Sequence, residues 1–431
     1  MKIISKIIFL ILIVIILLGT YLSIFGIETS KFNKQIQNQV KGINNNLSLE
    51  LKKVKLVLDP IRFNFSAKTL GPKIINQNEY LELENIKTSI SLKSLISNVF
   101  SIEQLEISTK SIEISNLISF VRLIYETPEL IVFEKLFNVK GYMIANIKVE
   151  FDKNGNLKDN YIFSGFIKDT KANLTKDFSI SKLNLNFDIR KDNINFKNLN
   201  VRLNNINLDS NSIYAQKIKN GYKVKGNLKN DLIELDAKDF IFFKKIFFTD
   251  IDIKKFKFNS KNNFTFKIND KFQLKDTTIS SKVNLKEAQI SKNVNLKDIF
   301  PEFENDISFF DHEIDLEYKK DFLSINGNGK ILIQKLDDII SYKIRKDQNK
   351  FEFEKIFKTK KNPFLLKLLN YEKKNSTETI IKLNGHRNKK DKIYIQSASL
   401  VEEKNKIEIK DIYFDKNLKI EKFENINLNY I

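Results

Sequence analysis

The feature that most constrains the fold is a two-residue alternation of apolar and polar residues, which recurs through almost the whole chain after residue 46. It begins at Leu47, Leu49 and Leu51, and lysine, asparagine, aspartate and serine fill most of the positions between apolar residues. Because successive side chains of a β-strand point to opposite faces, this period predicts strands with one apolar face. The clearest runs are Leu183, Leu185, Phe187 and Ile189; Phe256 and Phe258; and Phe264, Phe266 and Ile268.

Asparagine–glycine pairs punctuate these runs and favour tight hairpin turns. They occur at Asn154-Gly155, Asn220-Gly221, Asn326-Gly327 and Asn384-Gly385. Strands joined by short turns pair in chain order, so the sequence predicts a mainly β protein built on a long antiparallel sheet. One wide sheet buries its apolar face only if it curls, stacks or closes. We therefore expect a curled sheet that forms a groove.

A few segments depart from the two-residue period and are expected to be helical. Residues 116–137 have apolar residues at helical spacing, with Ser115 or Asn116 as a cap. Shorter helices are expected at Leu296–Phe310 and Phe364–Tyr371. The expected organisation is a tip and membrane anchor at 1–28, a linker or short helix at 29–46, a first sheet segment at 47–295 with a helical insert near 116–137, and a second at 296–431 that continues the first.

The first 28 residues contain an uncharged apolar run from Ile7 to Phe25. In helical form these nineteen residues span roughly 28 Å, which matches the hydrocarbon thickness of a bilayer. Lys2 and Lys6 precede the run and favour a cytoplasmic N-terminus with the body on the far side. A cleaved secretory signal is the alternative, although its apolar region is normally shorter and followed by small residues. Both interpretations take the body out of the cytoplasm.

No motif in the chain supports a catalytic mechanism, so we expect no catalytic, cofactor-binding or metal site. Cysteine is absent, which excludes disulfides and thiolate chemistry. The only histidines, His312 and His386, are far apart and lie in charged stretches, and both are expected at the surface. The glycines of the NGNGK run, Gly327 and Gly329, lack the third glycine of a dinucleotide fingerprint and are expected to form a hairpin turn.

The formal charge of +20 comes almost entirely from lysine. One interpretation is a biased composition that places solvated lysines on strand faces, and the other is a surface attracted to anionic lipid headgroups. Nucleic acid is not an expected partner. Arginine, on which base and bidentate phosphate recognition depend, is sparse and scattered, and the expected topology puts the body outside the cytoplasm.

A single apolar span is followed by the stretch ELENIKTSISLKSLISNVFSIEQLEISTKSIEI, by FDKNGNLKDNYIFSGFIKD and by repeated strand–turn–strand units. This order of features resembles the AsmA-like family of Gram-negative envelope proteins. It covers most of the chain as a pattern without a residue-level match. It implies an inner-membrane anchor, a periplasmic curled sheet with an apolar concave face, and a part in moving phospholipid toward the outer membrane.

The resemblance and the alternation together predict that phospholipid acyl chains lie on the inward-facing residues. The expected lining residues are Leu183, Leu185, Phe187, Ile189, Phe256, Phe258, Phe264, Phe266 and Ile268. An anchored assembly factor that binds protein clients is the first alternative, and an outer-membrane β-barrel is a weaker one. The C-terminal strand pattern also predicts an open sheet edge, which another copy or another envelope protein would cover.

Overall fold

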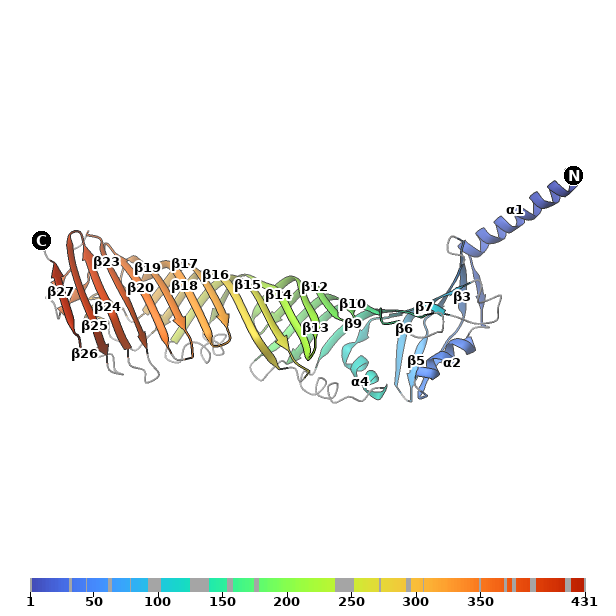
Figure 1. Ribbon diagram of the computed structural model, residues 1–431, viewed down its shortest axis with the longest axis horizontal. Coiled ribbons are helices and arrows are strands. Elements are labelled where there is room, and N and C mark those ends of the chain that lie inside the picture. Colours follow the sequence, from blue (N-terminus) through green and yellow to red (C-terminus); the bar gives the residue numbers. More distant parts are fainter. Residues whose placement is uncertain are drawn as a thin grey trace. The chain divides into compact units, whose positions relative to one another are not determined.

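The computed structural model describes most of the chain (Figure 1). The described residues are 2–30, 33–43, 45–60, 64–77, 79–91, 102–124, 139–152, 158–173, 178–236, 252–270, 273–291, 296–304, 306–348, 350–367, 370–373, 377–387, 393–414 and 420–429. Twenty-five strands belong to one antiparallel sheet that is not closed on itself. The mainly β fold, with an apolar N-terminal helix followed by a large open antiparallel sheet, is confirmed.

The chain divides into two compact units. The first contains residues 1–202 and 214–217, and the second contains residues 203–213 and 218–431. The division falls within β12 (Asn193–Leu203) and β13 (Ile206–Ile218). Phe300 and Phe303, which follow the expected boundary at 295/296, pack onto the sheet of the second unit.

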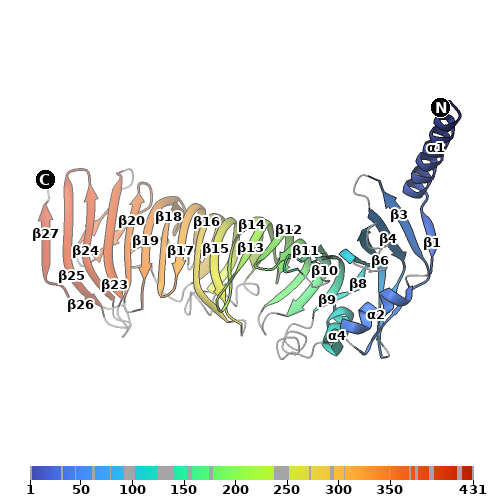
Figure 2. The same ribbon diagram turned by 45° about the vertical axis from the view of Figure 1, so that its right-hand side comes forward.

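The first unit begins with helix α1 (Figure 2), and helices α2 and α4 of its described residues pack on its strands. Helix α1 is long and apolar enough to cross a membrane, and a signal sequence meets the same criteria. The elements are α1 (Lys2–Ile24), β1 (Ile27–Thr29), α2 (Asn33–Ile43), β2 (Leu47–Glu50), β3 (Val54–Asp59), β4 (Asn64–Leu70), β5 (Lys73–Asn76), β6 (Glu79–Ser91), β7 (Ile102–Thr109), β8 (Ile112–Glu113), α4 (Ile114–Ile124), β9 (Lys140–Glu150), β10 (Ile162–Asn173) and β11 (Ser179–Arg190).

Helices α2 and α4 cover part of the apolar sheet face of the first unit. In α2, Ile36 and Val40 lie four residues apart, on one side of the helix, and pack against the buried Val54 of β3. In α4, Phe120 packs against Leu81 of β6. The linker expected at 29–46 thus contains a helix. Of the helical insert expected near 116–137, α4 accounts for the residues up to Ile124, and residues 125–137 lie outside the described residues.

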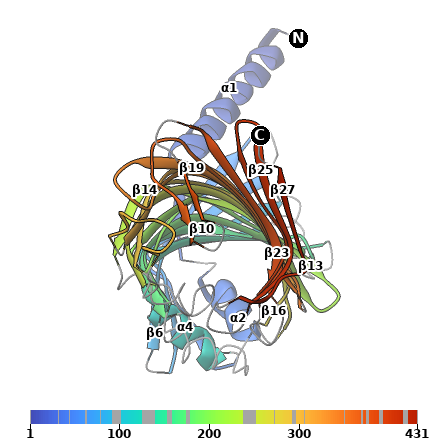
Figure 3. The same cartoon turned by 90° about the vertical axis from the view of Figure 1, so that its left-hand side faces the viewer.

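The second unit is a meander of antiparallel strands. Each strand from β14 to β20 pairs with the next, β20 pairs with β23, and β23, β24 and β25 follow in order. Figure 3 shows these strands bowed, so that the sheet of this unit has a concave side. The elements are β14 (Gly221–Asp236), β15 (Asp252–Ile268), β16 (Leu274–Ser291), β17 (Asp306–Lys319), β18 (Phe322–Leu332), β19 (Asp337–Lys346), β20 (Phe351–Thr359), β21 (Leu365–Leu366), β22 (Tyr371–Glu372), β23 (Thr379–Arg387), β24 (Ile393–Glu402), β25 (Asn405–Phe414), β26 (Ile420–Lys422) and β27 (Asn425–Asn429).

Several local expectations are wrong. In the expected helix at 296–310, the described residues form turns up to 304 and strand β17 from 306. In the one at 364–371, they include β21 and the start of β22, and residues 368 and 369 lie outside the described residues. Of the asparagine–glycine pairs, Asn220-Gly221 does lie at the turn between β13 and β14. The pair at 326–327 lies inside β18 and the pair at 384–385 lies inside β23. The pair at 154–155 lies outside the described residues.

The glycines inside β18 have a packing role. An added Cβ at Gly327 would lie 2.4 Å from the Tyr342 ring, and one at Gly329 would lie 2.3 Å from the His312 ring. Each glycine therefore leaves room for an aromatic ring from a neighbouring strand, which is one of the reasons glycine occurs within strands. The sequence pattern cannot separate this role from a hairpin turn.

Candidate functional site

One continuous apolar sheet face in the second unit is the candidate site, and the register of the strands shows how it is built. Directly paired residues on adjacent strands point to the same face of a sheet. Between β14 and β15, Val224 pairs with Phe266. Between β15 and β16, Phe264 pairs with Ile279. The apolar positions of each strand are therefore in register with those of its neighbour.

The same register continues through the rest of the unit. Ile325 of β18 pairs with Ile344 of β19, which pairs with Phe353 of β20. Further along, Leu400 of β24 pairs with Ile407 of β25. We call this surface, which runs over β14–β20 and β23–β25, the apolar face. It consists of alternate residues of each strand, among them Leu228, Phe266, Val283, Leu316, Ile325, Ile344, Phe353, Leu383, Leu400 and Ile407.

The opposite face of the same strands, called the polar face below, carries lysine, glutamate and asparagine. Lys343 of β19 pairs with Glu354 of β20, and Arg345 pairs with Glu352. The two faces differ because most positions of these strands alternate between these residue types. The second unit is thus a sheet with one apolar and one polar side.

Most side chains of the apolar face are half-buried. Leu285 and Val224 are 5% and 7% exposed, but Tyr318 is 38% exposed, and Leu316 and Ile344 are of intermediate burial. If a second sheet covered this face, as in a β-sandwich, the inward residues would be close-packed and dry. The partial exposure instead leaves apolar surface along the sheet that an apolar ligand can cover.

Two connectors cover one flank of the apolar face. Phe303, in the connector between β16 and β17, is 2% exposed and packs with Ile331 at the end of β18. Phe364, in the connector between β20 and β23, packs with Leu400 of β24. Phe300 contacts both groups. These contacts fall at the ends of the strands that adjoin the connectors, so the opposite flank retains the partly exposed residues.

The two connectors are joined to each other and to the sheet by hydrogen bonds. The amide of Leu365 donates to the carbonyl of Ile299 at 2.9 Å. Gln334 accepts from the amide of Glu302 at 2.9 Å and donates to the carbonyl of Pro363 at 2.8 Å. A buried polar group that is fully paired adds geometric specificity to such a contact. We call residues 296–304 and 360–373, as far as they are described, the connector cover.

His312 lies on the apolar face, so the expectation that it sits at the surface is wrong. It is 1% exposed, its Nε2 lies 2.9 Å from the carbonyl oxygen of Lys330, and its ring contacts Phe309 and Tyr342. Burial lowers the pKa of His312 and raises the pKa of Tyr342 to about 12. Both rings are therefore neutral at physiological pH, as an apolar surface requires.

A small polar cluster interrupts the apolar face on β14 and β15. Ser260 donates to Oδ1 of Asn230 at 2.5 Å, and Nδ2 of Asn262 donates to Oγ of Ser260 at 2.8 Å and to the carbonyl of Leu228 at 3.1 Å. These polar groups satisfy one another, so their burial does not carry the cost of an unpaired donor or acceptor.

The structure places the nine residues expected to line a lipid groove in two groups. Phe256, Phe258, Phe264, Phe266 and Ile268 all lie on the apolar face, on β15. The other four lie on β11 of the first unit, where Leu185 and Phe187 are 6% and 5% exposed. Ile189 pairs with Phe163 and Leu183 with Thr170, both on β10. Whether any of the nine contacts lipid remains a prediction.

Sequence reasoning missed most of the apolar face. Residues such as Ile314 and Leu316 on β17, and Ile340 to Ile344 on β19, alternate as regularly as the residues of β15. The same two-residue period identifies them, but only once the register of each strand is known. No group of three or more metal-binding side chains occurs within the described part of the chain.

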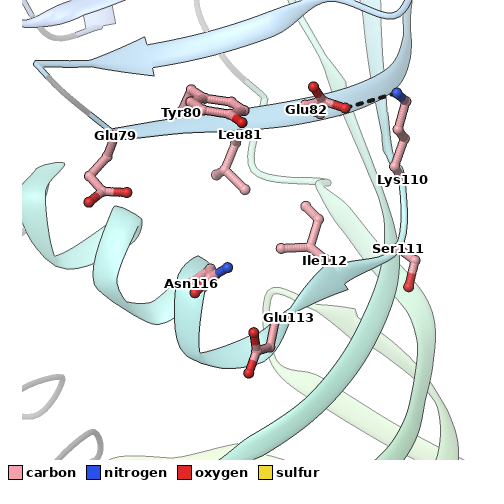
Figure 4. Close-up of a pocket in the computed structure, with 9 residues that line it drawn as sticks. All are labelled: Glu79, Tyr80, Leu81, Glu82, Lys110, Ser111, Ile112, Glu113 and Asn116. Carbon is pink, nitrogen blue, oxygen red and sulfur yellow. Dashed lines mark hydrogen bonds and ion pairs between the residues drawn. The ribbon is translucent and has the colours of Figure 1, made fainter.

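A shallow polar depression of about 400 Å³ lies in the first unit between β6, β8 and the start of α4 (Figure 4). Glu82 lies between Lys110 and Lys73 at 2.9 and 3.4 Å, and these two lysines lower the pKa of its carboxyl. Glu79 and Glu113 also border the depression. The arrangement is an ion-paired surface, with no nucleophile–base pair among the residues that line it.

The chain matches no protein-family model, no curated protein and no solved structure.

Proposed function

We propose that this chain is a membrane-anchored protein of the cell envelope that carries phospholipid acyl chains on the apolar face of its second unit. In this proposal α1 is an uncleaved inner-membrane anchor with a cytoplasmic N-terminus, and the body lies in the periplasm. The activity is non-enzymatic and serves phospholipid transport and outer-membrane lipid homeostasis. The resemblance to the AsmA-like family supports these points.

The observation that carries the proposal is the half-exposed apolar face. Ten strands, β14–β20 and β23–β25, give nine spacings of about 4.8 Å, on the order of 45 Å of apolar surface. One leaflet of a bilayer is about 15 Å of hydrocarbon thick. The face is thus long enough for more than one acyl chain, and it needs no specific ligand residues.

The energy of such binding follows from the area that it buries. Removing one CH₂ group from water contributes about 0.8 kcal/mol. A chain of about sixteen carbons, covered on one side only, gains roughly 6 kcal/mol by the same measure. This is enough to retain a lipid yet weak enough to release it, as a carrier requires.

The test is the lipid content of the full-length protein. The protein is extracted in a detergent that preserves bound lipid, and native mass spectrometry counts phospholipid molecules per chain. A variant that places charge on the apolar face, Leu316→Lys with Ile344→Lys, is compared with Glu317→Lys and Arg345→Glu on the polar face. We expect bound phospholipid in the parent and the polar-face control, and less in the apolar-face variant.

An anchored assembly factor gives a different result. Such a protein would co-purify with a protein client and without phospholipid. A variant that lost the client would show no change in lipid content. A parent protein free of phospholipid, or equal lipid in both variants, would rule out the carrier.

A further inference from the structure

The polar face of the second unit carries two rows of three lysines. Within each row, the lysines lie directly opposite one another on three adjacent strands. In the first row Lys223 of β14 pairs with Lys267 of β15, which pairs with Lys275 of β16. All three side chains are exposed. Neighbouring strands are about 4.8 Å apart, and like charges directly opposite each other destabilise a sheet. This row therefore carries a cost in stability.

The second row repeats the arrangement six residues further along β14 and β15. Lys229 pairs with Lys261, and Lys261 pairs with Lys282. None of these three lysines forms an ion pair with any described residue, although Asp315 of β17 is the cross-strand partner of Lys282. We call the six residues of both rows the lysine rows.

The strand segments of β14 and β15 that carry the lysine rows provide no carboxylate to neutralise their charge. The segments from Lys223 to Lys229 and from Lys261 to Lys267 contain no carboxylate. The nearest carboxylate is that of Asp276, which lies 2.7 Å from Lys267 and whose pKa this lysine lowers. On the next strand, β17, Asp315 lies opposite Lys282, and Glu313 and Glu317 lie on the same face.

Some other lysines of the polar face have acidic partners. Lys255 lies 2.9 Å from Glu287 and 3.6 Å from Glu234. By contrast, Lys229, Lys261 and Lys282 lie directly opposite one another on three adjacent strands with no ion pair to a described residue.

Between the rows, β15 and β16 present small hydrogen-bonding groups, and β14 presents Asn227 and a further lysine, Lys225. Thr265 and Thr278 pair with each other, and Asn263 pairs with Ser280. The aromatic residues of β15 point to the other face, and β14–β16 contain no arginine. Stacking on bases and bidentate recognition, on which nucleic-acid binding depends, are therefore not provided. Point charges with interspersed hydroxyl and amide donors match the phosphates of lipid headgroups.

We propose that the lysine rows bind the surface of an anionic phospholipid bilayer. Charge complementarity between the exposed lysines and anionic headgroups carries the inference. The rows are about 20 Å apart along the strands and about 10 Å wide. They would therefore face several headgroups at once. This inference concerns the polar face and is independent of acyl-chain binding on the apolar face.

The test uses the full-length protein in nanodiscs of phosphatidylcholine, mixed with separate vesicles and analysed by flotation. One vesicle set is phosphatidylcholine alone, and the other contains one part phosphatidylglycerol to two parts phosphatidylcholine. The row variant is Lys229→Gln, Lys261→Gln and Lys282→Gln. The control removes the same charge from lysines with carboxylate partners. It is Lys286→Gln, Lys330→Gln and Lys350→Gln, whose parent ion pairs to Asp311, Asp337 and Glu352 measure 3.1, 3.3 and 2.6 Å.

We expect the parent to bind the anionic vesicles, to lose this binding at high salt, and to bind neutral vesicles weakly. Each lysine near an anionic surface contributes about a fivefold gain in affinity, so the row variant should bind at least about tenfold more weakly. The control should bind nearly as the parent does. The variant with arginine at positions 229, 261 and 282 should retain binding, which separates lost charge from misfolding.

Three results would overturn the inference. The first is equal weakening of the row variant and the control, which indicates general attraction by net charge. The second is equal binding to neutral and anionic vesicles. The third is unchanged binding of the row variant to anionic vesicles together with a loss of its binding to single-stranded DNA, which assigns the rows to nucleic acid.

Discussion

Phe303 provides the sharpest test of how the connector cover is held on the apolar face. The side chain is 2% exposed and forms one buried cluster with Ile331 and Ile333. Replacing it with alanine removes a whole aromatic ring from that cluster. Substitutions of this kind in cores cost about 3–5 kcal/mol, from lost transfer free energy and from the cavity left behind.

The loss should be local to the connector cover. Ile299 lies in the same connector as Phe303 and accepts a hydrogen bond from the amide of Leu365 in the other connector. Loosening one connector should therefore loosen the other. Hydrogen exchange followed by mass spectrometry on the full-length protein should show faster exchange in peptides covering 296–304 and 360–373. Peptides from β10 and β11 should exchange as in the parent, because the cluster around Phe303 consists of residues of the second unit.

Phe423→Ala is the matched control, since that side chain is 42% exposed. Its effect on unfolding should stay within about 0.5 kcal/mol, as for other exposed substitutions. Unchanged exchange in both connectors of Phe303→Ala, or a midpoint of urea unfolding equal to that of the control, would refute the view that Phe303 anchors the cover.

Three further outcomes follow from single residues. Lys261→Glu should raise the midpoint of urea unfolding, because it replaces two like-charge pairs by two opposite-charge pairs worth about 0.2–1 kcal/mol each; an unchanged or lower midpoint contradicts this. Gly327→Ala should destabilise by about 1–3 kcal/mol, because the new Cβ meets the Tyr342 ring, and the additional change Tyr342→Leu should recover part of that loss. Burial raises the pKa of Asp338, so the folded state holds this proton more tightly than the unfolded chain does. The stability that this proton contributes is complete below the pKa of Asp338 in the unfolded chain and is lost as pH rises through its raised pKa in the folded state. Asp338→Asn should therefore reduce the fall of the urea midpoint between acidic and neutral pH. A variant whose midpoint falls with pH as steeply as that of the parent contradicts this.

The sequence predicts the strands well, because their signal is local. The alternation around Phe264 and Phe266 sets both the element and the face, since all five selected residues of β15 share the apolar face. The apolar run at the N-terminus likewise predicts α1 by length and composition alone. Signals of this kind need no information from distant residues.

The errors come from tertiary context. The spacing of Phe300 and Phe303 suggests a helix. Both positions are apolar instead because their side chains pack against apolar residues of the sheet. Gly327 next to asparagine suggests a turn. The position requires glycine instead because the Tyr342 ring of β19 occupies the space that a Cβ would need. His312 has charged neighbours in sequence, yet a strand residue alternates faces with those neighbours and His312 points to the apolar side. None of these environments is visible in a single strand.

The central claim is that one face of the second unit contacts acyl chains and the other does not. Photo-crosslinking tests it with adjacent residues that point to opposite faces. A benzophenone amino acid is placed at Phe264 or Thr265, at Leu316 or Glu317, and at Phe353 or Glu354 of the full-length protein in cells. We expect phospholipid adducts at positions 264, 316 and 353 and none at 265, 317 and 354. Equal adducts at both members of each pair, or adducts at neither, would contradict the proposal.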